Sequence, residues 1–377
     1  MSNRTPIAPA LALLSGLRTA WGAWRARWQG LLICASIAMA ATVLGGSGWL
    51  QEHGVGALTI AIVIGMVTGN TAYRHAPGLG RICGPGVDYS RQTLLRAGVI
   101  LYGFRLTMQD VGTFGLSGAL IDAAVLMSTF ALSTYAGTRW LGMDRKSALL
   151  IATGSSICGA AAIMAAEPVV RARAEQVTVA VATVVVFGTL SIFLYPALYH
   201  LNAHWHFVGG GDGVFGVYVG STVHEVAQVV ATARSIGPNA ADTAVIAKMV
   251  RVMMLAPFLL GLSFWLNRDR AGAGDLAKRD AQGPRTAVAI PWFPLGFVAV
   301  VLFNSLHLAS GNGREIVLAV DNLLLAMAMA ALGLSTHVAA IRQAGARPLL
   351  LALFSFCWLV VAGALINRWV PDLLAGA

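Results

Sequence analysis

The fold of this chain is decided by one stretch of its sequence, Thr153-Gly154-Ser155-Ser156-Ile157-Cys158-Gly159-Ala160-Ala161-Ala162. The stretch lies inside the apolar segment 147–166, which two glycines and two serines interrupt near its middle. In lipid, a broken helix leaves backbone groups without partners, and this is tolerated only where the backbone is enclosed by protein or lines a cavity. The interruption therefore marks a candidate binding site.

A second stretch of the same kind follows, Val219-Gly220-Ser221-Thr222-Val223-His224-Glu225-Val226-Ala227-Gln228. It opens with the same Gly-Ser-Ser/Thr triplet, but it adds ionisable and amide side chains. Paired, interrupted apolar segments in two halves of a chain are the best sequence indication of a transporter binding site.

The composition is that of an integral membrane protein. Of 377 residues, 57% are hydrophobic and 11% are charged, and the mean hydropathy is +0.72. A soluble domain carries about 25% charged residues. The net charge of +10 comes mostly from Lys and Arg in short loops, which is typical of cytoplasmic anchoring rather than of nucleic-acid binding. We expect an all-α polytopic membrane protein whose partner is the lipid bilayer, with no nucleic acid.

No motif predicts catalysis, a metal site or a cofactor. The four cysteines show neither metal nor disulfide spacing. A Walker motif, an HExxH motif and a nucleophile elbow are all missing from the sequence. We therefore expect a secondary transporter rather than an enzyme or a nucleotide-driven pump.

The apolar segments predict the topology. Residues 1–29, with four arginines and three tryptophans, are expected to form a cytoplasmic N-terminal segment, and residues 30–377 a transmembrane transporter domain. Nine segments have roughly the length that spans a bilayer. They are 30–50, 55–73, 94–111, 114–138, 176–199, 242–266, 288–308, 315–335 and 348–369.

The two interrupted segments, 147–166 and 215–233, leave two topologies open. If both cross the membrane, the chain has eleven spans. If both dip in and return, it has nine spans plus two re-entrant segments. Dipping keeps Arg171 and Arg173 inside and the uncharged, His- and Gly-rich loop 200–213 outside, which the usual bias of basic loops favours.

An internal repeat also favours the dipping scheme. Gly154-Ser155-Ser156 matches Gly220-Ser221-Thr222, and an acid opens an apolar run behind each triplet. The repeats are expected at about 94–200 and 215–370. Under the dipping scheme they run in opposite directions through the membrane, and inverted repeats are a common transporter plan.

The second stretch carries the candidate ion-coupling residues. Glu225 and Gln228 are spaced i, i+3 and face the same side if the helix resumes after Thr222. His224 is their neighbour. A carboxylate at membrane depth is by default a functional hypothesis, here a proton or sodium site. The alternative is a structural ion pair of Glu225 with Lys248 or Arg251.

Both stretches also suit an anion. A half-helix that starts after the first triplet would aim free N–H groups and its positive end into the cavity. Close helix packing through small residues is the alternative for the glycines, and snorkelling to the interface is the alternative for Arg105. The anion-binding candidates are Gly154, Ser155, Ser156, Gly220, Ser221, Thr222, Arg105, Lys248 and Arg251.

Together with Leu101-Tyr102-Gly103-Phe104-Arg105-Leu106-Thr107, the two Gly-Ser stretches resemble the YeiH-type sulfate exporter family over most of the chain. The resemblance implies a bacterial inner-membrane protein of the bile-acid/arsenite/riboflavin transporter superfamily, whose members use inverted repeats and interrupted helices. Glu225 stands where the family has an acid after His. Glu225 and Gln228 are also similar to the Glu and Gln of the sodium site in bile-acid symporters.

These observations predict a secondary transporter for a small inorganic or organic anion, with sulfate, sulfite or a sulfonate suggested by the resemblance. Glu225, Gln228 and His224 would couple its transport to protons or sodium by alternating access. The alternatives are a passive anion channel and, from another class, a membrane-embedded enzyme or sensor. The sequence leaves the oligomeric state open, a homodimer included.

Overall fold

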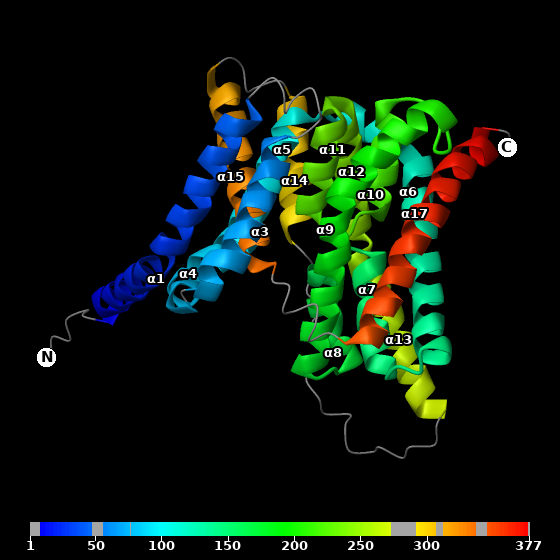
Figure 1. Ribbon diagram of the computed structural model, residues 1–377, viewed down its shortest axis with the longest axis horizontal. Helices are drawn as coiled ribbons and strands as arrows, with labels where there is room; N and C mark the ends of the chain where they lie inside the picture. The colour runs from blue at the N-terminus through cyan, green and yellow to red at the C-terminus, as the bar shows by residue number, and fades with distance from the viewer. Residues whose placement is uncertain are drawn as a thin grey trace, which may run out of the picture.

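The computed structural model describes residues 8–46, 56–75, 77–272, 292–306, 312–336 and 345–375, and in these ranges the chain is helical with no strand (Figure 1). Parts of the predicted N-terminal segment and of the spans 30–50, 55–73 and 288–308 lie outside the described residues. Within the described ranges, α1 runs without a break across the predicted boundary at residue 29.

The α-helices are α1 (Ala8–Gly45), α3 (Ala57–His75), α4 (Pro77–Tyr89), α5 (Leu95–Tyr102), α6 (Met108–Tyr135), α7 (Arg145–Ser156), α8 (Ala160–Val170), α9 (Ala174–Trp205), α10 (Asp212–Thr222), α11 (Val226–Ile236), α12 (Pro238–Met253), α13 (Leu255–Gly272), α14 (Trp292–Ser305), α15 (Asn312–Ser335) and α17 (Ala346–Ala375). Two short π-helices, η1 (Ser90–Leu94) and η3 (Ala136–Trp140), and one 3-10 helix, η2 (Gly103–Arg105), connect or extend them.

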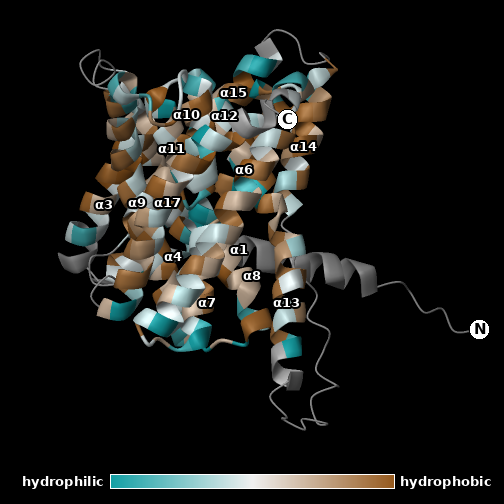
Figure 2. Cartoon of the chain, turned by 90° about the vertical axis from the view of Figure 1, so that its right-hand side faces the viewer, coloured by the Kyte–Doolittle hydropathy of each residue, from teal (hydrophilic) through white to brown (hydrophobic). Residues whose placement is uncertain are grey.

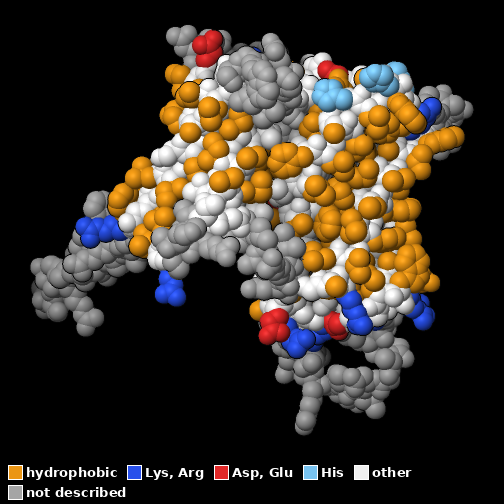
Figure 3. All heavy atoms as spheres, viewed as in Figure 1, with side chains coloured by type: hydrophobic (Ala, Val, Ile, Leu, Met, Phe, Trp, Pro, Cys, Tyr) orange, Lys and Arg blue, Asp and Glu red, His pale blue; other side chains and the backbone are white. Residues whose placement is uncertain are grey.

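Many of these helices have the length and composition of membrane spans. Among the described residues, six helical stretches qualify: Trp24–Gly45, Phe114–Trp140, Ala174–Trp205, Pro238–Arg268, Gly313–Ser335 and Ala346–Val370. Hydrophobic residues prevail along the helices, and hydrophilic ones gather at the two ends of the bundle (Figure 2). On the face seen in Figure 3, basic side chains gather at the lower end and histidines at the upper end. The predicted all-helical membrane class is confirmed, whereas the number of spans stays a prediction.

The predicted span 94–111 has both of its ends wrong: its helical run stops at Arg105, and α6 already begins at Met108. The segment expected to begin at residue 94 is helical from Pro77, through α4, η1 and α5. The glycines of α4 are typical of a loop, but here they allow close packing: a Cβ atom on Gly86 would clash with the backbone carbonyl of Arg27 in α1. Small residues serve this purpose in membrane helices, so tertiary packing overrides the local preference for a loop.

The helices pack as two groups. The first group consists of α1, α3, α4, α5, α14 and α15, and the second of α6 to α13 with α17. Contacts are dense within each group and sparse between them, where α11 touches α15 and α3, and α14 touches α12 and α6. The groups cut across the predicted repeats 94–200 and 215–370, so the packed units are not the repeats. The inverted repeat itself stays a prediction.

Helices α7 and α8 form a hairpin that returns to the end where it started. Lys146, at the start of α7, donates a hydrogen bond of 2.8 Å to the carbonyl of Arg171, just after α8. In one straight helix these residues would lie about 38 Å apart at roughly 1.5 Å per residue. This hairpin occupies the lower half of the bundle in Figure 1.

Helices α10 and α11 form a second hairpin from the opposite end. A Cβ atom on Gly237, directly after α11, would lie 3.5 Å from the carboxylate of Asp212 at the start of α10. Figure 1 shows this hairpin in the upper half. Both segments thus have the geometry of the dipping scheme, with their tips near the middle of the bundle.

Candidate functional site

The tips of the two hairpins meet. The backbone leaves the helical path at residues 157–159 in the first hairpin and at 223–225 in the second. Lys248 of α12 donates to the carbonyls of both Ile157 (2.8 Å) and Val223 (2.6 Å). Two helix carboxyl ends, from α7 and α10, and two helix amino ends, from α8 and α11, therefore converge in the interior.

The carboxyl ends are held by buried cations. Besides the two bonds of Lys248, Arg251 donates to the carbonyl of Ser156 through Nε (2.8 Å) and Nη2 (2.5 Å). Both side chains are fully buried. The last carbonyls of a helix lack partners and carry partial negative charge, so the two cations satisfy them. The alternative pairing of these cations with Glu225 is not seen among the described residues.

The amino ends share one carboxylate. Glu225 precedes α11, and its backbone N–H donates to Oε1 of Gln228 (3.1 Å). Across the gap, the backbone N–H of Ala160, the first residue of α8, donates to Oε1 of Glu225 (3.4 Å). The carboxylate therefore lies at the amino ends of two helices, where negative charge is stabilised.

The backbone around Glu225 and Gln228 is shaped by two glycines. Gly159 has φ 67° and ψ −131°, a conformation that residues with a Cβ atom rarely adopt. A Cβ atom there would also lie 2.6 Å from Cγ of Glu225. On α9, a Cβ atom on Gly188 would lie 2.6 Å from Cδ of Gln228. The first hairpin and α9 thus leave room for the side chains of the second hairpin.

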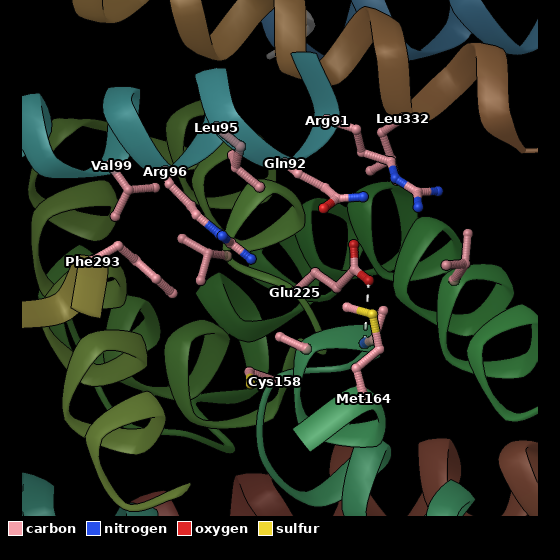
Figure 4. A pocket seen from close by; sticks show the side chains of 14 residues that line it. Arg91, Gln92, Leu95, Arg96, Val99, Cys158, Met164, Glu225, Phe293 and Leu332 are labelled. Atoms are coloured by element: carbon pink, nitrogen blue, oxygen red, sulfur yellow. Dashed lines mark hydrogen bonds between the residues drawn. The ribbon is translucent and has the colours of Figure 1, made fainter. Parts of the chain in front are cut away.

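A cavity of about 110 Å³ opens beside Glu225. Its polar lining consists of Arg91 and Gln92 from η1, Arg96 from α5, and Glu225. Figure 4 shows the Gln92 amide and the Arg96 guanidinium directed into the space that Glu225 enters from the other side. Since one water needs only about 10–15 Å³, the cavity has room for a small solute. It lies at the boundary of the two helix groups.

Arg91, Gln92 and Arg96 were not among the predicted site residues. The π-helix η1 carries Arg91 into the bundle. Short π-helical turns are frequent at functional sites. The available signal was two arginines and an amide within six residues, directly before the apolar run 97–102.

The predicted hydroxyl ligands lie elsewhere. Ser156 donates to the carbonyl of Thr153 (3.2 Å), and Ser221 and Thr222 both donate to the carbonyl of Tyr218 (3.1 and 2.5 Å). The hydroxyl of Ser155 is buried without a partner among the described residues. All four stand at the carboxyl ends of half-helices, outside the lining of the cavity. Their anion-binding role stays a prediction.

Gly154, Gly220 and His224 also pack away from the cavity. A Cβ atom on Gly154 would lie 2.7 Å from the side chain of Ile163, and one on Gly220 would clash with the backbone of α12. Close helix packing, the alternative weighed for these glycines, fits this geometry. The ring of His224 is buried, 6.2 Å from that of Phe356 in α17.

Arg105 takes part in a network that joins the two helix groups. It pairs with Asp321 of α15 (2.9 Å), which also accepts from Arg234 of α11 (3.4 Å). Arg234 donates to Asn322 as well (2.7 Å). Asp321 lies buried inside α15, which begins at Asn312.

The ring of Tyr102 completes this network. The guanidinium carbons of Arg105 and Arg234 lie 5.2 and 5.3 Å from its centroid, within the range of a cation–π contact. Its hydroxyl donates to Asp242 of α12 (3.0 Å). Within the described ranges, no group of three or more His, Cys, Asp or Glu side chains could hold a metal ion.

Comparisons with known proteins support a shared family. The sequence pattern of the family described as Conserved hypothetical protein 698 matches residues 29–352. A UPF0324 membrane protein of Pseudomonas aeruginosa is 57% identical over 339 residues, which cover 90% of this chain and 93% of the relative. The UPF0324 inner membrane protein YeiH of Escherichia coli is 48% identical over 345 residues, covering 90% and 95%. No solved structure matches the chain.

Proposed function

This chain belongs to the family described as Conserved hypothetical protein 698, and we propose that it is a secondary transporter of small anions, coupled to protons or sodium. One observation carries the proposal. Two arginines, a glutamine and the amino end of α8 converge on one cavity between two loosely joined helix groups, and Glu225 already occupies that amino end.

The convergent groups are those that bind anions. A guanidinium offers a fixed fork of N–H donors that suits carboxylate, sulfonate and phosphate oxygens. A helix amino end adds backbone donors and positive dipole charge. Arg96 belongs to the first helix group, as does Arg91 on η1, which packs against α4, α5 and α15. Ala160 and Glu225 belong to the second. An anion bound here would contact both groups at once.

Glu225 supplies a means of coupling. Its carboxylate accepts from the same α8 amino end that an incoming anion would use, and two negative charges at one site repel each other. Anion binding is therefore expected to favour a Glu225 that is protonated, or neutralised by sodium. In the proton-coupled case, lowering the pH therefore strengthens anion binding, and the anion crosses the membrane together with a proton.

The two helix groups suit alternating access. Few contacts join them, so one can move against the other at modest cost. The network of Arg234 with Asp321, Asn322 and Tyr102 ties the second group to the first. It stands at the upper end of the bundle, beyond the cavity along α5. We propose that this network closes the upper end of the cavity in this conformation, and that its contacts break when the two helix groups rearrange.

The proposed membrane, orientation and substrate rest on three different observations. Relatives of this chain are named inner membrane proteins, and we place it in that membrane. The basic lower end would be cytoplasmic, and the N-terminus with it. Sulfate, sulfite or a sulfonate as substrate is supported only by the resemblance noted above, as is the assignment to the bile-acid/arsenite/riboflavin transporter superfamily.

The experiment that tests the proposal is anion flux into proteoliposomes with imposed proton and sodium gradients. Labelled sulfate, sulfite and taurine serve as probes. Arg96→Gln should abolish flux of every probe that wild type carries, and Glu225→Gln should abolish its dependence on the gradients. Arg139→Gln and Glu175→Gln are matched controls on exposed side chains and should behave as wild type.

Two other results would change the conclusion. Flux that only relaxes to equilibrium, in wild type and Glu225→Gln alike, would make the protein a passive anion channel. Flux that survives in Arg96→Gln would contradict the assignment of the cavity.

A further inference from the structure

The cavity has two kinds of wall. Its cationic and amide groups come from η1 and the start of α5, and its single carboxylate comes from the second hairpin. The rest of the wall is apolar or small, and includes Val99, Met164, Phe293 and Leu332. A solute held here would meet donors on one side and hydrocarbon on the other.

The apolar wall begins directly beside the donors. Val99 follows Arg96 by one turn of α5, so the two side chains share a face of that helix. Figure 4 shows Val99 and Phe293 next to Arg96, on the side away from Glu225. Val99 is 1% exposed. This end of the cavity is therefore formed by side chains without hydrogen-bonding groups.

These walls select against a fully polar solute. An inorganic oxyanion carries oxygen on every side, and oxygens turned toward Val99 and Phe293 would lose water without gaining a partner. A solute with an anionic head and a hydrocarbon tail avoids that cost. Its tail also gains roughly 0.8 kcal/mol for each methylene removed from water.

We infer that the cavity takes an organic anion with a short apolar tail in preference to an inorganic oxyanion. The inference rests on the proposed function and names its substrate class. The head lies between Arg96, Gln92 and the amino end of α8, and the tail lies against Val99 and Phe293.

The test is a homologous series with one head and growing tails. Binding of methane-, ethane-, propane- and butanesulfonate and of inorganic sulfate to the purified full-length protein is measured by titration calorimetry. Each added methylene should tighten Kd about fourfold until the cavity is filled. Propanesulfonate should bind more tightly than sulfate.

Two variants separate head from tail. Arg96→Gln should weaken the whole series by a similar factor. Phe293→Ala should flatten the gain per methylene, whereas Phe264→Ala, on the exposed face of α13, should keep the gain. If Phe293→Ala fails to fold, the wild-type series still decides the question.

The outcomes for the two claims differ. A series in which Kd is independent of tail length, or in which sulfate binds tightest, overturns the inference. If that binding still depends on Arg96, the proposed function stands. If wild type binds none of these anions, both claims fail.

Discussion

The two hairpins share a backbone design and differ in the chemistry that they contribute. Each enters from one end of the bundle, breaks for three residues and has the carboxyl end of its first half-helix held by Lys248. The first hairpin contributes backbone N–H groups, the tight Gly159 turn and the apolar side chain of Met164. The second contributes Glu225 and Gln228. We conclude that the common geometry builds the site, and that the second hairpin alone supplies its carboxylate.

The largest expected effect comes from what the hairpins share. Lys248→Met would leave the carbonyls of Ile157 and Val223 buried without partners. Since each such group costs about 1–3 kcal/mol, we expect a loss of stability of about 2–6 kcal/mol. The readout is the midpoint of thermal unfolding in detergent. Lys146→Met, which removes an exposed hydrogen bond to one carbonyl, is the control. Equal midpoints for both variants would contradict the idea that Lys248 stabilises both hairpins through their carbonyls.

The next effect falls on the first hairpin. In Gly159→Ala the new methyl group would overlap Glu225, and the residue would be held at positive φ. Anion flux should fall more than tenfold, because the carboxylate must leave its place. Gly142→Ala, also at positive φ but in open space, imposes the strain alone and should keep flux within about twofold of wild type. Similar losses in both variants would mean that strain, and not Glu225, explains the effect.

A smaller effect, on stability, is expected where α9 packs against the second hairpin. In Gly188→Ala the methyl group would collide with the Gln228 amide, and overpacking of this kind costs about 1–3 kcal/mol. The double variant Gly188→Ala/Gln228→Ala should recover part of that stability, since it removes the colliding group. A double-mutant cycle with additive losses would show that the two positions do not interact.

The smallest effect should come from the hydroxyl groups that the hairpins share. Ser156→Ala and Thr222→Val remove bonds that each side chain makes to its own half-helix. We expect changes of about 1 kcal/mol or less in stability and flux within about twofold of wild type. A tenfold loss of flux in either variant would restore the sequence-based prediction that these hydroxyls bind the anion.

The sequence predicted the helical membrane class, an interruption in each of the two segments and the juxtaposition of Glu225 with Gln228. The expected position of each interruption is wrong: the Gly-Ser triplets end α7 and α10, and the helices resume at Ala160 and Val226 rather than directly after the triplets. The predicted features depend on local signals: apolar length, Gly-Ser triplets and an i, i+3 spacing. The partners of Lys248 and Arg251 could not be predicted this way. Their hydrogen-bond acceptors are backbone carbonyls from about 25 to 95 positions away in the chain. Every residue has a backbone carbonyl, so the sequence does not mark which ones accept these bonds.

The cavity was missed for a related reason. Arg91 follows a Gly-rich segment with the appearance of a loop, and only packing against α1 makes that segment helical. The arginines then face Glu225 from a different helix group. Predicting this placement requires knowing how the groups meet, which short sequence patterns do not specify.

We propose that an anion and the Glu225 carboxylate use the same helix amino end. The most direct measurement is the number of protons taken up on anion binding, obtained by calorimetric titration of propanesulfonate in buffers of different ionisation enthalpy. In sodium-free medium, wild type should take up about one proton per anion at a pH where Glu225 is ionised, and Glu225→Gln should take up none. If sodium replaces the proton, wild-type binding should require sodium and Glu225→Gln should not. Equal affinity in both proteins, with neither proton uptake nor sodium dependence, would contradict the account.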